Sequence, residues 1–164
     1  MKKSELRSII REIVLNEIGE GVKPYPYRRV ESSKTSSSYE FTTDAGVKYE
    51  AFFELKDKRQ VLYVEFSIIN EQGRVIQNIT FKQNPRELFR VMSTVKDIIE
   101  KEFMSDKTVK IIKFSAAKGK TDNHNSLKGS EQRKNIYLQY IKKSFPDADH
   151  MMLGGEHVVF LDRN

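Results

Sequence analysis

The chain contains no cysteine among its 164 residues. Without a thiol it cannot form disulfides, bind a metal through thiolates or use a cysteine nucleophile. No apolar run approaches the ~20 residues of a transmembrane helix, so a membrane partner is not expected. The composition, 38% hydrophobic and 32% charged residues, is instead typical of a folded domain with a heavily charged surface.

The N-terminal part of the chain differs in pattern from the rest. Apolar residues recur at helical spacing up to Ile18 and predict an amphipathic helix over residues 4–18. The stretch GEGVKPYPYRRV ends this helix, because it holds two glycines and two prolines. The next stretch, ESSKTSSS, has six hydroxyl residues in eight, which is typical of a flexible linker. We therefore divide the chain into an arm, residues 1–37, and a single α+β domain, residues 38–164.

The domain begins with a series of strands. A first strand starts at Tyr39, and strict alternation over residues 47–55 predicts a half-buried second one. The apolar run VLYVEFSII and the segment VIQNITF, separated by the turn NEQGR, complete four sequential strands. Short turns between sequential strands predict an antiparallel meander.

The pattern then changes to helical spacing. Asn84 can cap a helix over residues 84–103, Pro85 suits its first position and Glu87 completes a capping box. A strand, TVKIIKFSA, follows, and then a second helix from Ser130. The chain ends in a β-hairpin that turns at Gly154 and Gly155. The domain is therefore expected to be α+β with a mainly antiparallel sheet.

Meander, helix, strand, helix and hairpin in this order resemble the Gcn5-related N-acetyltransferase fold. The best local match is LQYIKKSF, in which Tyr140 and Phe145 keep the family's tyrosine-to-phenylalanine spacing, while Gln139 and Ser144 depart from its pattern. The resemblance implies that Tyr140 is a general acid that protonates the thiolate of coenzyme A. The apolar face that Tyr140 shares with Ile136 favours the alternative, core packing.

The cofactor loop departs most from that family. Members of the family cradle the coenzyme's pyrophosphate with a glycine-rich loop at the start of the central helix. Here the corresponding stretch, FKQNPREL, has no glycine, and Pro85 removes one N–H donor. Lys82 and Arg86 supply charge without that loop geometry. We therefore expect no cofactor, with acetyl-CoA as the ligand only under the alternative of a divergent N-acyltransferase.

Positive charge is concentrated in one segment. Between Lys107 and Asn135 there are eight basic residues and only two acidic ones. The net charge of this segment, +6, equals the net charge of the whole chain. This favours an anionic partner, either nucleic acid or an acidic protein surface, and the alternative is a solvated loop. The candidate anion-binding residues are Lys118, Lys120, Lys128, Arg133 and Lys134. A phosphate-loop interpretation of KGKT fails, because Phe114 stands where the motif needs its first glycine.

Two of the three histidines lie near the predicted hairpin. His150 and His157 flank its turn, where a hairpin could bring them together. With Asp147, Asp149 or Glu156 they would form a two-histidine, carboxylate metal site. Isolated histidines at such positions are more often surface residues, and we predict no metal.

The arm has a second feature besides its helix. Ile18, Gly19, Glu20 and Gly21 match the pattern aliphatic, any residue, glutamate, small residue. The internal head proteins of tailed phages carry an arm that resembles this one, a short helix that directs the protein into the capsid and is removed after such a glutamate. The resemblance implies cleavage between Glu20 and Gly21, a capsid or scaffold partner, and residence in the virion or the host cytoplasm. The alternative is a helix that packs on its own domain.

The leading interpretation is a non-enzymatic phage accessory protein with an acetyltransferase-like domain. Its N-terminal helix would dock on a partner, and its basic loop would bind an anionic one. The alternatives are a divergent acyl-CoA-dependent N-acyltransferase that uses Tyr140, and a nonspecific nucleic-acid-binding protein.

Overall fold

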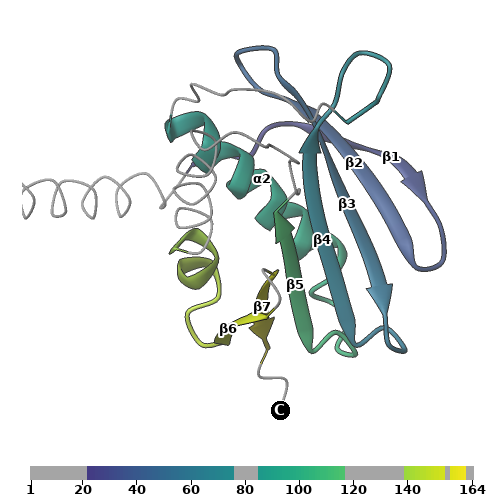
Figure 1. The fold of residues 1–164 in the computed structure, drawn as a ribbon, viewed down its shortest axis with the longest axis vertical. Helices are drawn as coiled ribbons and strands as arrows, with labels where there is room; N and C mark the ends of the chain where they lie inside the picture. The colour runs from purple at the N-terminus through teal and green to yellow at the C-terminus, as the bar shows by residue number, and fades with distance from the viewer. Residues whose placement is uncertain (1–21, 76–84, 117–138, 154–155, 162–164) are drawn as a thin grey trace, which may run out of the picture.

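A computed structural model describes residues 22–75, 85–116, 139–153 and 156–161. They form one seven-stranded sheet in the order β1-β2-β3-β4-β5-β7-β6, with a long helix lying behind it in the view of Figure 1. The fold class, α+β with a mostly antiparallel sheet, is confirmed. The elements are β1 (Tyr27–Ser32), β2 (Ser36–Thr42), β3 (Lys48–Lys56), β4 (Val61–Ile68), α2 (Pro85–Glu102), β5 (Ile111–Ala116), β6 (Asp149–Leu153) and β7 (Glu156–Phe160).

The four-strand meander lies earlier in the chain than the sequence predicted. It consists of β1 to β4, each antiparallel to the next. The expected linker at residues 31–38 instead forms the β1–β2 hairpin, so the domain boundary placed at residue 38 falls inside β2. The expected strand at residues 75–81 lies outside the described residues except for Val75, which bridges to Ile69.

Local hydrogen bonds and ring contacts explain why the hydroxyl-rich segment is ordered. The Ser36 amide donates to the Ser33 hydroxyl at 3.0 Å, which closes the turn. Beyond the turn the rings of Tyr27 and Tyr39 meet edge to face, with centroids 5.9 Å apart. Serine composition predicts a linker only where no such aromatic pair holds the flanking strands together.

The core lies between the sheet and α2. Alternate residues of β3, Tyr49, Ala51, Phe53 and Leu55, are buried, as their spacing predicted. Val91, Val95, Ile98 and Ile99 form the buried face of α2, and the ring of Phe103, just after the helix, stacks on Phe53 with centroids 5.0 Å apart. The predicted cap, Asn84, lies outside the described residues.

The C-terminal part of the sheet contains its one parallel pair. β5 runs parallel to β4, as expected for strands joined through a helical crossover, and antiparallel to β7. The predicted hairpin is confirmed as β6 and β7, which pair over the whole length of both strands. Of the predicted second helix the structure describes residues 139–144, which are helical.

Candidate functional site

The segment just after the candidate processing site is bound to α2. We call residues 22–26 the strap. The Ser93 hydroxyl donates to the carbonyl of Val22 at 2.7 Å, and the guanidinium of Arg90 donates to the carbonyl of Lys23 at 3.0 Å. The Tyr25 amide donates to the Thr94 hydroxyl at 2.8 Å. These contacts join residues about 70 positions apart and place the strap along one side of the helix.

The prolines of the strap disfavour a helix there. A proline disfavours helical backbone angles in the residue before it, which applies to Lys23 and Tyr25, and residues 22–26 are in neither a helix nor a strand. The prolines also have no amide proton, which leaves the Tyr25 amide as the donor that pairs with Thr94. The alternation of proline and tyrosine was therefore a signal for a non-helical, docked segment, and the sequence analysis missed it.

Tyr25 is the anchor of the strap. Its ring is buried between Phe41, with stacked centroids 6.2 Å apart, and the guanidinium of Arg90, 4.0 Å above its centroid. Arg90 also pairs with Asp44 at 2.7 Å. Burial raises the pKa of the Tyr25 phenol. The site therefore combines apolar burial, a cation over a ring and backbone hydrogen bonds.

A second tyrosine continues the attachment into the sheet. Tyr27, the first residue of β1, donates its hydroxyl to Asp97 of α2 at 2.9 Å. Burial, and then this hydrogen bond to a carboxylate, raise the pKa of Tyr27. Lys101 pairs with the same carboxylate at 2.8 Å. The strap and β1 are thus fastened to α2 over about two of its turns.

Tyr140, the candidate general acid, lies in the core. It is 8% exposed and belongs to the same buried cluster as Ile141 and Phe145. Its ring lies 6.4 Å from that of Phe89 on α2. Burial raises the pKa of Tyr140, while hydrogen bonding with Ser93, which also binds the strap, lowers it. The side chain is therefore buried against α2.

The other predicted site residues lie outside the described residues. This applies to the candidate processing residues Glu20 and Gly21 and to Lys82, and the side chain of Arg86 is not described. It also applies to the whole set of candidate anion-binding residues, Lys118, Lys120, Lys128, Arg133 and Lys134. Of the basic segment, Lys107 and Lys110 are described and exposed, whereas the ammonium of Lys113 donates to the Tyr63 hydroxyl at 3.2 Å.

His150 and His157 approach one another, and His157 is buried rather than at the surface. His150 Nδ1 lies 3.0 Å from His157 Nε2, and His150 Nε2 lies 3.0 Å from the carbonyl of Phe145. A carbonyl only accepts, so His150 carries a proton on Nε2, and a neutral His150 then accepts at Nδ1 from His157 Nε2. This leaves His157 Nδ1 buried without a partner among the described groups. Burial, and then the proximity of His150 and Lys142, lower the pKa of His157 to about 4.

The histidine pair joins the hairpin to the end of the last helix. His150 is in β6, His157 in β7, and the Phe145 carbonyl follows the helical residues 139–144. In the described ranges no three histidine or carboxylate side chains gather as a metal site would require. Asp149 points away, because it pairs in register with Phe160 while His150 pairs with Val159 on the other face. The pair is therefore a hydrogen-bonded clasp between the hairpin and the Phe145 carbonyl.

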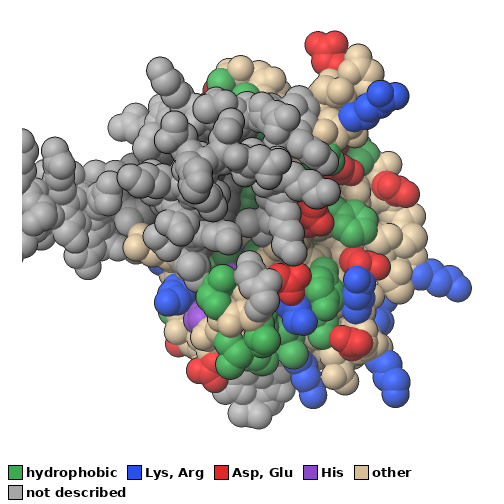
Figure 2. Space-filling model, in the orientation of Figure 1, with side chains coloured by type: hydrophobic (Ala, Val, Ile, Leu, Met, Phe, Trp, Pro, Cys, Tyr) green, Lys and Arg blue, Asp and Glu red, His purple; other side chains and the backbone are tan. Residues whose placement is uncertain are grey.

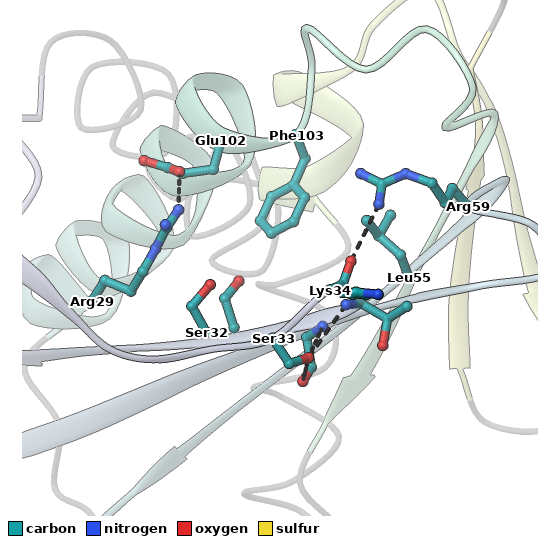
Figure 3. Close-up of a pocket in the computed structure, with 11 residues that line it drawn as sticks. Arg29, Ser32, Ser33, Lys34, Leu55, Arg59, Glu102 and Phe103 are labelled. Carbon is teal, nitrogen blue, oxygen red and sulfur yellow. Dashed lines mark hydrogen bonds and ion pairs between the residues drawn. The ribbon is translucent and has the colours of Figure 1, made fainter.

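A small polar pocket of about 120 Å³ lies between the β1–β2 hairpin and the end of α2 (Figure 3). Arg29 reaches Glu102 on one side of it, and Arg59 donates to the carbonyl of Lys34 on the other. Arg59 also pairs with Asp106 at 3.0 Å. Both guanidinium groups are thus already neutralised by carboxylates. The side chains that line the pocket therefore connect the hairpin to α2.

No helix among the described residues is long and apolar enough to cross a membrane. No protein family, curated protein or solved structure matches the chain.

Proposed function

We propose that the chain is a non-enzymatic accessory protein of a tailed phage, packaged in the virion or present in the host cytoplasm. Its domain is acetyltransferase-like, and its N-terminal segment docks on a capsid or scaffold protein. The observation that carries the proposal is the strap, whose described contacts with α2 include one at Val22, two residues after Glu20 of the candidate processing bond. Removal of residues 1–20 would leave every described contact of the strap in place.

The acetyltransferase-like fold is supported by the order of elements. A four-strand meander, a helix, a parallel strand, helical residues and a final hairpin follow one another along the chain. The non-enzymatic character is supported by two departures from the family pattern. The stretch before α2 lacks glycine, and Tyr140 is buried against Phe89 of α2. A general acid must reach its substrate within hydrogen-bond distance, which a core side chain does not.

The basic loop is proposed to meet an anionic partner. Its five candidate cations are Lys118, Lys120, Lys128, Arg133 and Lys134. Clustered lysines attract phosphates or carboxylates over distances set by the salt concentration. Binding to duplex DNA that falls steeply with salt, and that is lost when Lys118, Lys120 and Lys128 become alanine, would favour nucleic acid over an acidic protein surface.

Thermal unfolding with and without millimolar acetyl-CoA tests the non-enzymatic character. A ligand present at 100 times its dissociation constant stabilises a fold by about 2.7 kcal/mol, or several degrees for a domain of this size. We expect no shift. An upward shift would overturn this part of the proposal and favour the acyltransferase, and Tyr140→Phe would then be assayed for transfer activity.

Two truncations test whether the N-terminal segment is separable. A variant that lacks residues 1–20 should unfold within about 2 °C of the full chain, since the strap stays intact. A variant that lacks residues 1–26 loses Tyr25 and the strap hydrogen bonds, and should unfold several degrees lower. If removal of residues 1–20 lowered the unfolding temperature as much as removal of residues 1–26, the first helix would be part of the domain and the docking proposal would fail.

A further inference from the structure

Among the described residues strand β6 forms one edge of the sheet and lacks the features that usually guard an edge. Its residues pair in unbroken register with β7 on one side, and no described strand lies on the other. It contains no proline, lysine or arginine, and its ladder has no bulge. Natural sheets usually guard their edges with such features, because a bare edge offers unpaired N–H and C=O groups to another chain.

The side chains of this edge are apolar and exposed. Met151, Met152 and Leu153 are 50%, 48% and 53% exposed. Successive strand residues point to opposite faces, so Met151 and Leu153 lie on one face of the sheet and Met152 on the other. A partner that packed on one face of the sheet would leave the apolar side chains of the other face exposed to water. A strand added along the edge covers both at once, because it places side chains on both faces.

The apolar surface continues from the edge onto the outer face of the sheet, the face opposite α2. Val158 is buried there but lies outside the main core cluster, and it pairs in register with Met151. Next to it Phe160 and Ile111 form a half-buried pair. Figure 2 shows hydrophobic side chains gathered on the lower part of this face, where β5, β6 and β7 lie, below a region of mixed charge.

We propose that β6 is a homodimer interface, at which the β6 strands of two copies pair antiparallel about a twofold axis near Met151. The two sheets then join into one continuous sheet. In this register Met151 lies opposite its own copy and Asp149 lies opposite Leu153. The apolar strip of one outer face adjoins that of the other.

Charge favours a second copy in this orientation. The strand carries one formal charge, at Asp149, which stands at its first position. Antiparallel pairing sets the two aspartates at opposite ends of the joint, whereas parallel pairing would put them side by side. The strand is thus self-complementary, with apolar residues at its centre and no like charges in opposition. A strand from another protein would need the same chemistry. Whether the purified chain forms a dimer distinguishes a second copy from such a partner.

Sedimentation of the full chain from about 5 to 200 µM tests the proposal. We expect a monomer–dimer equilibrium for the wild type. Met151→Lys should weaken the dimer by at least about tenfold, because two ammonium groups would face each other across the axis. Val30→Lys is the matched control, since Val30 is 42% exposed on the opposite edge strand, β1, and should leave the dimer intact. A wild type that stays monomeric, or variants that weaken the dimer equally, would overturn the proposal.

A cross-linking experiment tests the register and does not depend on a weakened dimer. The chain has no cysteine, so a single Met151→Cys substitution gives an unambiguous disulfide. Residues directly opposite in an antiparallel pair have Cα atoms about 4.5–5.5 Å apart, within the range of a disulfide. Oxidation should yield a covalent dimer with Met151→Cys or, if the axis lies one residue on, with Met152→Cys. If both cross-link no more than a Val30→Cys control, the interface is elsewhere.

Discussion

The two edges of the sheet differ in chemistry and in how they are held. Edge strand β1 presents Arg28 and Arg29, and its ladder shifts register between Arg29 and Glu31. Edge strand β6 has three half-exposed apolar side chains and an unbroken ladder. Charge and irregular pairing discourage a further strand at β1, whereas β6 has one charge, at its first position, and no register shift. One sheet thus has a closed edge and an open one.

The attachments to the rest of the fold differ in the same way. Near β1 the strap and Tyr27 are fastened to α2 by a buried ring, hydrogen bonds and charged pairs. At β6 the clasp is a pair of imidazoles joined to one carbonyl. The first attachment contains no histidine, whereas the second includes His157, whose pKa burial lowers to about 4, so that imidazole is neutral near pH 7.

The largest expected effect is at the closed edge. Tyr25→Ala removes a buried ring from between Phe41 and Arg90 and should lower the free energy of unfolding by about 3 kcal/mol. Urea unfolding monitored by circular dichroism measures it. Val30→Ala, an exposed change on β1, should stay within about 0.5 kcal/mol of wild type. Equal losses for the two variants would mean that the strap does not hold this edge.

The second effect is an acid sensitivity of the open edge. The pKa of His157 is about 4 in the folded chain, below its ordinary value of 6.5. The unfolded chain therefore binds the proton first, and stability that is complete above pH 6.5 is lost as the pH falls towards 4. We expect a loss of about 1–2 kcal/mol once solvent screening is allowed for.

Comparison with His157→Leu isolates this effect from the carboxylates that also titrate near pH 4. The free energy of unfolding of the variant should change less between pH 6.5 and 4, while the Tyr25→Ala variant should keep the wild-type slope. Parallel profiles for wild type and His157→Leu would show that the clasp is not the acid-sensitive element.

The smallest effect concerns the charges of β1. Arg29→Met removes hydrogen bonds to the Tyr39 hydroxyl and an ion pair with Glu102, and should cost about 0.5–1 kcal/mol. Arg28→Met removes a more exposed pair with Glu40 and should have no measurable effect in urea unfolding. If both arginines proved equivalent, the contact of β1 with α2 through Arg29 would have no role in stability.

Much of the fold could be predicted from local pattern. The alternation over residues 47–55 and the helical spacing over residues 84–103 each report which face of an element is buried, and β3 and α2 occupy those segments. The C-terminal hairpin followed from two apolar runs around a glycine pair, and the approach of its histidines from their positions beside that turn.

The candidate site was harder to predict. Resemblance to a family predicted a chemical role for Tyr140, whereas its apolar neighbours predicted that it packs in the core. The structure places it in the core. Composition predicted a linker at residues 31–38, because hydroxyl side chains are typical of flexible segments. The ordered hairpin there depends on Tyr27 meeting Tyr39 and on Tyr27 reaching Asp97, contacts that no local window contains.

The sequence by itself determined the class of the fold, the long amphipathic helix and the final hairpin, since each follows from a period or a turn within about twenty residues. The tertiary structure decided where the strap lies, which strands form the edges and which histidine nitrogen is left unpartnered. These features depend on partners up to about 70 residues apart, brought together by burial of the shared core. Periodicity reports that a face is buried, and only the folded chain shows what it is buried against.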